Sequence, residues 1–172
     1  MSEKNKSENK KSAMEAASAY LASRMRTVAE VRQRLRDKEY DEGEIEDAVR
    51  ELIELGYLDD YQYALRYYEY NREKKRGSLR AMRELSEKGV DEATIKNARE
   101  DFLYENKVDE YADALNVGMK IVEDSEDKTD PDKLQAKAAR RLESAGYQKG
   151  DIIKVLEMIG SQSKYDGDGS YE

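Results

Sequence analysis

One spacing recurs three times along this chain and limits what it can fold into. A leucine, an apolar residue and an isoleucine follow one another at intervals of five, as Leu35–Tyr40–Ile45, Leu85–Val90–Ile95 and Leu142–Tyr147–Ile152. Helical spacing flanks each triad on both sides, as in RLRDKEYDEGEIEDAV around the first. Each triad therefore predicts a helix end, a short turn closed by an apolar plug, and a new helix. Together they predict an internal repeat.

The remaining sequence supports helices throughout, and no segment alternates as a strand would. Thr27 and Glu30 form a capping-box pattern, and Asp130 followed by Pro131 marks another helix start. Charged residues make up 41% of the chain, which favours an elongated array over a compact globule. We predict an all-α fold of three tandem three-helix repeats, with about nine helices.

The repeat also sets the boundaries that we expect. The polar start and the glycine-containing end of the chain lack usable apolar periodicity. The predicted segments are a disordered tail at 1–12, repeats at 13–56, 57–104 and 105–159, and a second disordered tail at 160–172.

Residue types on which many enzymes and metal sites depend are missing. The 172 residues include no cysteine and no histidine, which excludes disulfides, thiolate metal sites and the commonest general base. The glycines are scattered and form no phosphate-cradling loop. We therefore predict no catalytic residue, no cofactor and no metal, and a protein that is not an enzyme.

Membrane and export signals are also lacking. No apolar run approaches the ~20 residues that span a bilayer. The opening MSEKNKSENKK has no apolar core of the kind found in signal peptides. We expect no membrane association and a cytoplasmic location.

The net charge of −8 conceals two basic stretches. Residues 24–36 hold five arginines, and residues 64–88 hold eight lysines or arginines against four glutamates. Such side chains beside aromatic rings suit phosphates, stacked bases or an acidic protein surface. A solvated helix end, stabilised by the macrodipole, is the simpler interpretation of 74–76. The candidate partner- or DNA-binding residues are Arg24, Arg26, Arg32, Arg66, Arg72, Lys74, Lys75, Arg76, Arg80 and Arg83, and we expect the last seven on one solvent-facing strip.

The stretch GYLDDYQYALRYYEYNREKKRG, residues 56–77, contains six of the thirteen tyrosines. As a helix it has two possible apolar stripes, Tyr61–Ala64–Leu65–Tyr68 and Tyr63–Tyr67–Tyr70–Lys74. Periodicity alone leaves open which stripe is buried.

Two segments, ELIELGYLDDYQYA and KRGSLRAMRELSEKGVDEATI, resemble the RecX regulatory proteins, bacterial modulators of the RecA recombinase. The resemblance is good over residues 13–103 and rests on the repeat alone over 104–159. It departs from the family pattern at Glu39, where a glycine is expected, and at Ser78, where a proline is usual. It implies that Tyr63, Ala64, Tyr67 and Tyr68 face inward, with Tyr61 and Tyr70 flanking them.

The resemblance also implies a shape and a function. The array would be curved and would bind along the groove of a RecA filament on single-stranded DNA. It would inhibit filament extension, ATP turnover and strand exchange, and so act in homologous recombination, DNA repair and the SOS response. The expected partners are the RecA filament and single-stranded DNA, the latter weakly or through the filament, and we expect a monomer.

Two other functions fit a helical repeat. A helix-turn-helix transcriptional regulator is one, although helices that open DEGEIEDA and DEATIKNA are acidic where a recognition helix would meet DNA. A generic helical scaffold that binds only protein is the other. Neutralising the basic residues would then leave partner binding intact.

Overall fold

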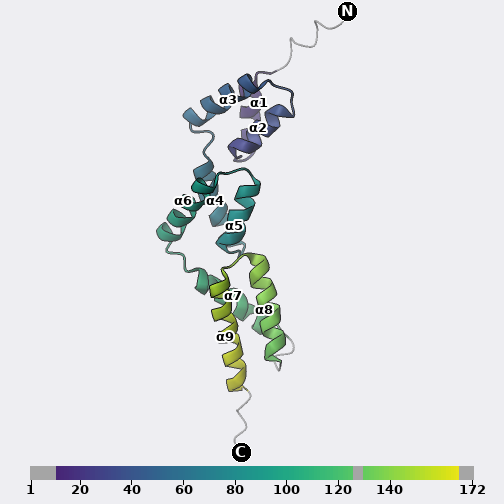
Figure 1. The fold of residues 1–172 in the computed structure, drawn as a ribbon, viewed down its shortest axis with the longest axis vertical. Helices are drawn as coiled ribbons and strands as arrows, with labels where there is room; N and C mark the ends of the chain where they lie inside the picture. Colours follow the sequence, from purple (N-terminus) through teal and green to yellow (C-terminus); the bar gives the residue numbers. More distant parts are fainter. Residues whose placement is uncertain (1–10, 126–129, 167–172) are drawn as a thin grey trace, which may run out of the picture. The chain divides into compact units, whose positions relative to one another are not determined.

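A computed structural model describes residues 11–125 and 130–166 of the chain (Figure 1). Within these residues the chain is helical and has no strand, which confirms the all-α prediction. The helices are α1 (Ala13–Leu21), α2 (Val28–Arg36), α3 (Glu42–Glu54), α4 (Asp60–Glu73), α5 (Ser78–Glu87), α6 (Glu92–Glu105), α7 (Glu110–Glu123), α8 (Pro131–Ala145) and α9 (Lys149–Asp166). Over the same stretches, none of the helices combines the length and apolar content that crossing a membrane requires.

Contacts divide the chain into two compact units. The first comprises residues 1–64 and 85–98, and the second comprises 65–84 and 99–172. This division runs through α4, α5 and α6, whereas the boundaries expected from the sequence lie between helices. The three-repeat division remains a prediction.

The first unit contains a core made by α1, α2 and α3, which contact one another pairwise (Figure 1). Its most deeply buried side chains include Val31, Leu35, Ile45, Val49 and Leu52, each 0 or 1% exposed. These residues recur at helical spacing along α2 and α3, so each helix turns one apolar stripe inward.

The second unit contains a core made by α7, α8 and α9, which also contact one another pairwise. Leu134 and Leu142 of α8 pack with Val155 and Ile159 of α9. Gly146 reverses the chain between α8 and α9, which lie side by side in Figure 1. Elsewhere in this unit, the rings of Tyr68 and Phe102 stack with centroids 5.6 Å apart.

The residues of the three triads are all buried, with at most 9% of any residue exposed. Each triad also closes its turn in one way. The backbone N–H of the apolar plug donates to the carbonyl of the leucine five residues earlier, as from Tyr40 to Leu35, Val90 to Leu85 and Tyr147 to Leu142. The residue before each plug has a left-handed φ, which characterises a common helix C-terminal motif.

Helix starts follow local side-chain chemistry. The predicted capping box of Thr27 and Glu30 is present, and Asp130 accepts a hydrogen bond from the backbone of Lys133 at the start of α8. Ser78 is the first residue of α5 and bonds to side chains outside that helix. Its hydroxyl donates to Glu110 and accepts a hydrogen bond from Arg99.

The predicted tails differ from the structure at their inner ends. Ser12 caps α1, and α9 continues to Asp166 although the tail was predicted to begin at 160. Gly160 therefore lies within α9, where it packs closely against Gln135: an added Cβ would be 2.4 Å from the Nε2 atom. The predicted disorder of 1–10 and 167–172 concerns residues outside the described ranges.

Candidate partner-binding surface

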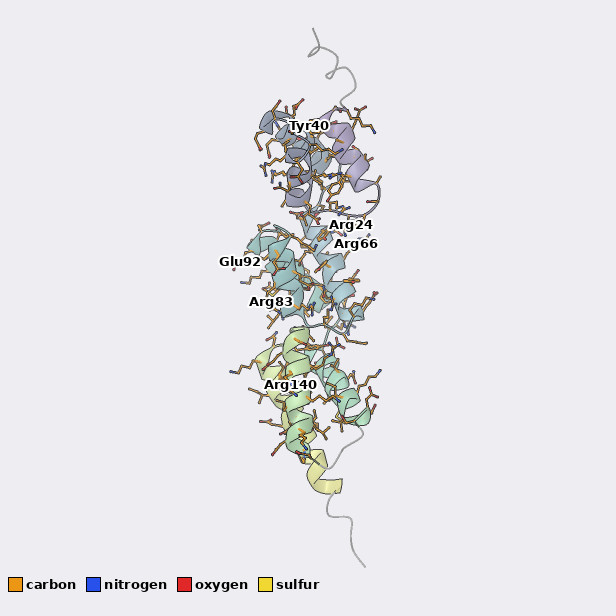
Figure 2. The ribbon with its side chains drawn as sticks, turned by 90° about the vertical axis from the view of Figure 1, so that its right-hand side faces the viewer. Arg24, Tyr40, Arg66, Arg83, Glu92 and Arg140 are labelled. Atoms are coloured by element: carbon orange, nitrogen blue, oxygen red, sulfur yellow. The ribbon has the colours of Figure 1, made fainter. Side chains whose placement is uncertain are left out.

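The first unit carries an arginine cluster, defined here as Arg24, Arg26 and Arg34, of which the last two lie over the ring of Tyr20. The guanidinium carbon of Arg26 lies 4.0 Å from the Tyr20 ring centroid, and that of Arg34 lies 5.6 Å from it. Both distances are within the range of cation–π attraction. Arg24 stands on the segment between α1 and α2 (Figure 2).

Local structure explains how these residues meet. Tyr20 is in the last turn of α1, and Arg26 immediately precedes Thr27, the N-cap of α2. Arg34 is in the last turn of α2. Burial raises the pKa of Tyr63; Glu30 adds to the shift, whereas Arg24 and Arg26 oppose it. The two arginines therefore also lie within electrostatic reach of the Tyr63 hydroxyl.

Other arginines of the first unit are bound to carboxylates. Arg32, which the sequence placed among the binding residues, forms two hydrogen bonds of 2.8 Å with Glu46. This contact raises the pKa of Arg32 and lowers that of Glu46. Arg36 pairs with Glu42 and Arg50 with Asp47. In contrast, no ion pair joins any of the three cluster arginines to another residue that the structure describes.

Only some of the α4 residues that the resemblance places on the inward face are buried. Ala64 at the unit boundary and Tyr68 are buried, Tyr67 is half-buried and Tyr70 is 46% exposed. The Tyr67 hydroxyl donates to a carboxylate oxygen of Glu84 at 2.8 Å. Burial acts to raise the pKa of Glu84, but hydrogen bonds from Tyr67 and Arg80 outweigh it and lower the pKa.

Two residues of the predicted strip are committed to internal ion pairs. Arg72 donates to Asp113 at 2.8 Å. Arg80 donates to Glu84 at 2.8 Å and to the carbonyl of Ser144 at 3.2 Å. Folding thus brings a carboxylate to each of these two guanidinium groups, and the common solvent-facing strip remains a prediction.

The other cations of the strip lie at different places on the unit. Lys74 is exposed, with its amine 5.7 Å from the centroid of the Tyr70 ring. Lys75 has a left-handed φ of 57° at the end of α4, and Arg76 is half-buried just after it. The structure thus brings Lys74 together with Tyr70 on the exposed side of α4.

Arg66 and Arg83 are the remaining members of the strip. Both side chains are exposed, the first on α4 and the second on α5 (Figure 2). Neither forms an ion pair with another described residue. Both therefore remain available to a partner.

Sequence reasoning missed Tyr20 and Arg34 as members of a site. The signal available was the density of arginines in 24–36 after a tyrosine near a helix end. Helical spacing cannot tell which of these arginines meets a glutamate of α3, because that depends on how α2 and α3 pack. Among the described residues, no group of acidic side chains is arranged to hold a metal ion.

Residues 13–52 match the family model of the RecX first three-helix domain. RecX regulatory proteins are among the relatives. The one from Halalkalibacterium halodurans is 40% identical over 92 residues, covering 53% of this chain and 35% of that protein. The one from Lactobacillus gasseri is 30% identical, covering 94% of this chain and 58% of that protein. The one from Bacillus subtilis is 27% identical, covering 89% and 64%. The chain thus spans less than two thirds of the length of each of these relatives.

Solved structures share the fold. The crystal structure of RecX from Lactobacillus salivarius superposes with a TM-score of 0.70 at 23% identity, covering 86% of this chain and 94% of that one. A second RecX crystal structure gives a TM-score of 0.70 at 22% identity. Sequence matches along the chain and a common helical fold lead to one conclusion. The chain belongs to the family of RecX regulatory proteins.

Proposed function

We propose that this protein binds a RecA recombinase filament on single-stranded DNA and inhibits its activity. The inhibited steps are filament extension, ATP turnover and strand exchange. The protein acts by binding, without catalysis of its own, as a monomer in the cytoplasm. Its contact with DNA is weak or made through the filament. Support comes from membership of a family of regulatory proteins and from the distribution of charge.

The observation that carries the proposal is the arginine cluster. The chain has a net charge of −8, and Arg32, Arg36 and Arg50 of the first unit are all paired with carboxylates. The cluster instead presents cations that no described carboxylate neutralises, beside aromatic rings. Such a surface attracts a polyanion locally, while acidic surface elsewhere limits indiscriminate attachment to nucleic acid.

The direct test measures DNA-dependent ATP hydrolysis by RecA while the purified protein is added. Substoichiometric amounts should suppress hydrolysis, because one molecule that blocks a growing filament end affects every subunit that would have joined after it. Filament length by electron microscopy should fall in parallel. Unchanged hydrolysis and unchanged length at a stoichiometric excess would rule the proposal out.

Two triple variants separate the cluster from general charge. One changes Arg24, Arg26 and Arg34 to Gln, and the matched control changes Arg32, Arg36 and Arg50 to Gln. Both remove three positive charges from the first unit. The cluster variant should lose inhibition while remaining folded, because Arg24 and Arg34 are exposed and such charges contribute only about 0–1 kcal/mol each to stability. Arg26 is half-buried, so circular dichroism must verify that this variant is folded. The control should still inhibit; equal loss in both would assign the effect to net charge.

The helix-turn-helix alternative receives no support from the start of α3. Glu42 there is paired with Arg36, and Glu44 closes the capping box with Asp41. A helix that begins with these carboxylates would repel DNA phosphates.

A further inference from the structure

A second apolar stripe runs along α5 in addition to the one that faces the core. Ala81 and Leu85 are fully buried, as a single amphipathic stripe requires. Leu79 and Met82 lie on another side of the helix, and Leu79 remains 39% exposed. The core accounts for the first pair of residues but not for the second.

α9 has the same property. Val155 and Ile159 are buried in the core of the second unit. Ile153 is 47% exposed, and Leu156, three residues further along, is half-buried on the same side of the helix. α9 and the part of α5 that belongs to the same unit, residues 78–84, therefore each expose apolar side chains that folding alone does not need.

These surplus side chains line a single groove. Leu79 and Met82 of α5 line an open depression of about 590 Å³ together with Ile153 and Leu156 of α9, and Gly146 and Tyr147 also line it. All of these residues belong to the second unit. The volume falls within the ~300–1,000 Å³ typical of sites that hold a small ligand or the anchoring side chains of a peptide.

The charges at the rim indicate what the groove would accept. Arg83 and Lys149 line it, with one opposing carboxylate from Glu143. Neither cation forms an ion pair with another described residue, whereas neighbouring Arg80 and Lys154 are paired with Glu84 and Asp151. The apolar floor thus has an excess of available positive charge at its edge.

We propose that this α5–α9 groove is a docking site for a short amphipathic segment of a partner protein. The segment would carry aliphatic or aromatic anchors one helical turn apart and a carboxylate beside them. The anchors would cover Leu79 and Ile153, and the carboxylate would pair with Arg83 or Lys149. A groove of this size suits a few anchors better than a second copy of the chain, since a stable dimer buries about 800 Å² per partner. The inference is independent of the proposed function.

The test pans a random 15-residue peptide display library on the full chain and counter-selects on the Ile153→Asp variant. Peptides that bind only the wild type should share apolar anchors at i and i+3 or i+4 with an adjacent Asp or Glu. Their affinity, measured by fluorescence anisotropy on synthetic peptides, should fall at least about tenfold in Ile153→Asp, as expected for a central anchor contact. Replacing the peptide carboxylate with Lys should weaken binding to the wild type and strengthen it to the Arg83→Glu, Lys149→Glu double variant.

The chain offers a matched control in Ile53, which is also 47% exposed but lies on α3 in the first unit. Ile53→Asp should leave peptide binding unchanged. The proposal is overturned if no peptide distinguishes wild type from Ile153→Asp, if the selected peptides lack a carboxylate, or if Ile53→Asp weakens binding equally. A concentration-dependent dimer in sedimentation that Ile153→Asp dissolves would assign the groove to a second copy. Thermal unfolding followed by circular dichroism verifies that each variant is folded.

Discussion

Gly56 and Gly89 adopt nearly the same left-handed backbone, with φ of 74° and 79°, in different surroundings. A Cβ added at Gly56 meets nothing within 4 Å, whereas one added at Gly89 would lie 2.4 Å from the Cβ of Ala29. Gly56→Ala should therefore cost about 1–2 kcal/mol, the penalty of the left-handed conformation. Gly89→Ala should cost a further ~1–3 kcal/mol because α2 must shift.

Urea denaturation of both variants measures this difference, and Gly56→Ala serves as the control for backbone strain. Equal losses at the two positions would contradict the close approach of Gly89 to Ala29.

Tyr147 links stability to alkaline pH. Burial raises its pKa to about 12, and Asp113 and Glu110 add to the shift. An unfolded phenol titrates near pH 10. Between about pH 10 and 12 the folded protein therefore holds a proton that the unfolded chain has lost, so the free energy of unfolding must decrease as the pH rises.

The Tyr147→Phe variant removes this proton. The difference in unfolding free energy between wild type and variant should stay constant from about pH 7 to 9 and should then shift against the wild type above about pH 10. Denaturant titrations at each pH measure it. A constant difference across the whole range would show that the hydroxyl does not carry the shift.

The sequence predicts the hydrogen-bond partners of some side chains but not of others. The capping box of Thr27 and Glu30 involves atoms three residues apart, so the local sequence is sufficient. The pair of Arg72 and Asp113 spans 41 residues and exists only because folding brings α4 and α7 together. For that reason the sequence identified Arg72 as a cation but could not show that it is already bound.

At the scale of the helix, the triads make the strongest prediction. Leu35, Leu85 and Leu142 are fully buried, so truncation of any one to Ala should cost about 2–5 kcal/mol. Leu55→Ala is the control, because Leu55 is 57% exposed and its truncation should change stability by no more than about 0.5 kcal/mol. Chemical denaturation of the four variants checks both values, and small losses at all three triad leucines would mean that the triads do not hold the core.

The ends of six helices share one geometry, and a glycine in the sequence indicates it at three of them. A left-handed residue follows α2, α3, α4, α5, α6 and α8, and the next N–H bonds to the carbonyl five residues earlier. Gly56, Gly89 and Gly146 indicate this conformation in the sequence, since glycine adopts it readily. Glu39, Lys75 and Lys107 adopt it without that signal. Helix starts and turn plugs were therefore predictable, and half of the left-handed positions were not.

At the scale of the molecule, the distribution of charge decides how binding should respond to salt. The arginine cluster is cationic within a chain of net charge −8. If it contacts DNA phosphates in the filament, raising the salt concentration should weaken binding through the return of counterions. The triple Gln variant of Arg24, Arg26 and Arg34 should reduce the slope of log affinity against log salt by about 2, from three contacts on a single strand.

Anisotropy with labelled RecA filaments over a salt titration measures the two slopes. Parallel slopes for the variant and the wild type would remove the cluster from the contact with DNA.

Periodicity and the triads were sufficient to predict an all-helical chain, because both depend on neighbours within a few residues. The two compact units were not predicted, since their division passes through three continuous helices. Nor could the sequence separate the cluster arginines from Arg32. All lie within the same thirteen-residue stretch, and only the position of Glu46 on α3 distinguishes them.

The shared geometry of the helix ends bears on how such a chain can lengthen during evolution. Each helix end is formed by the helix's own last turn and the residue that follows it. A duplicated helix and turn therefore keeps the residues that end the helix. Copying a gene segment then adds a unit that stops correctly wherever it is inserted, and only its apolar stripe must adapt to new neighbours. Glu39 lies where the corresponding turns have Gly89 and Gly146. The residue type differs there, but the left-handed backbone is kept, with a φ of 60°.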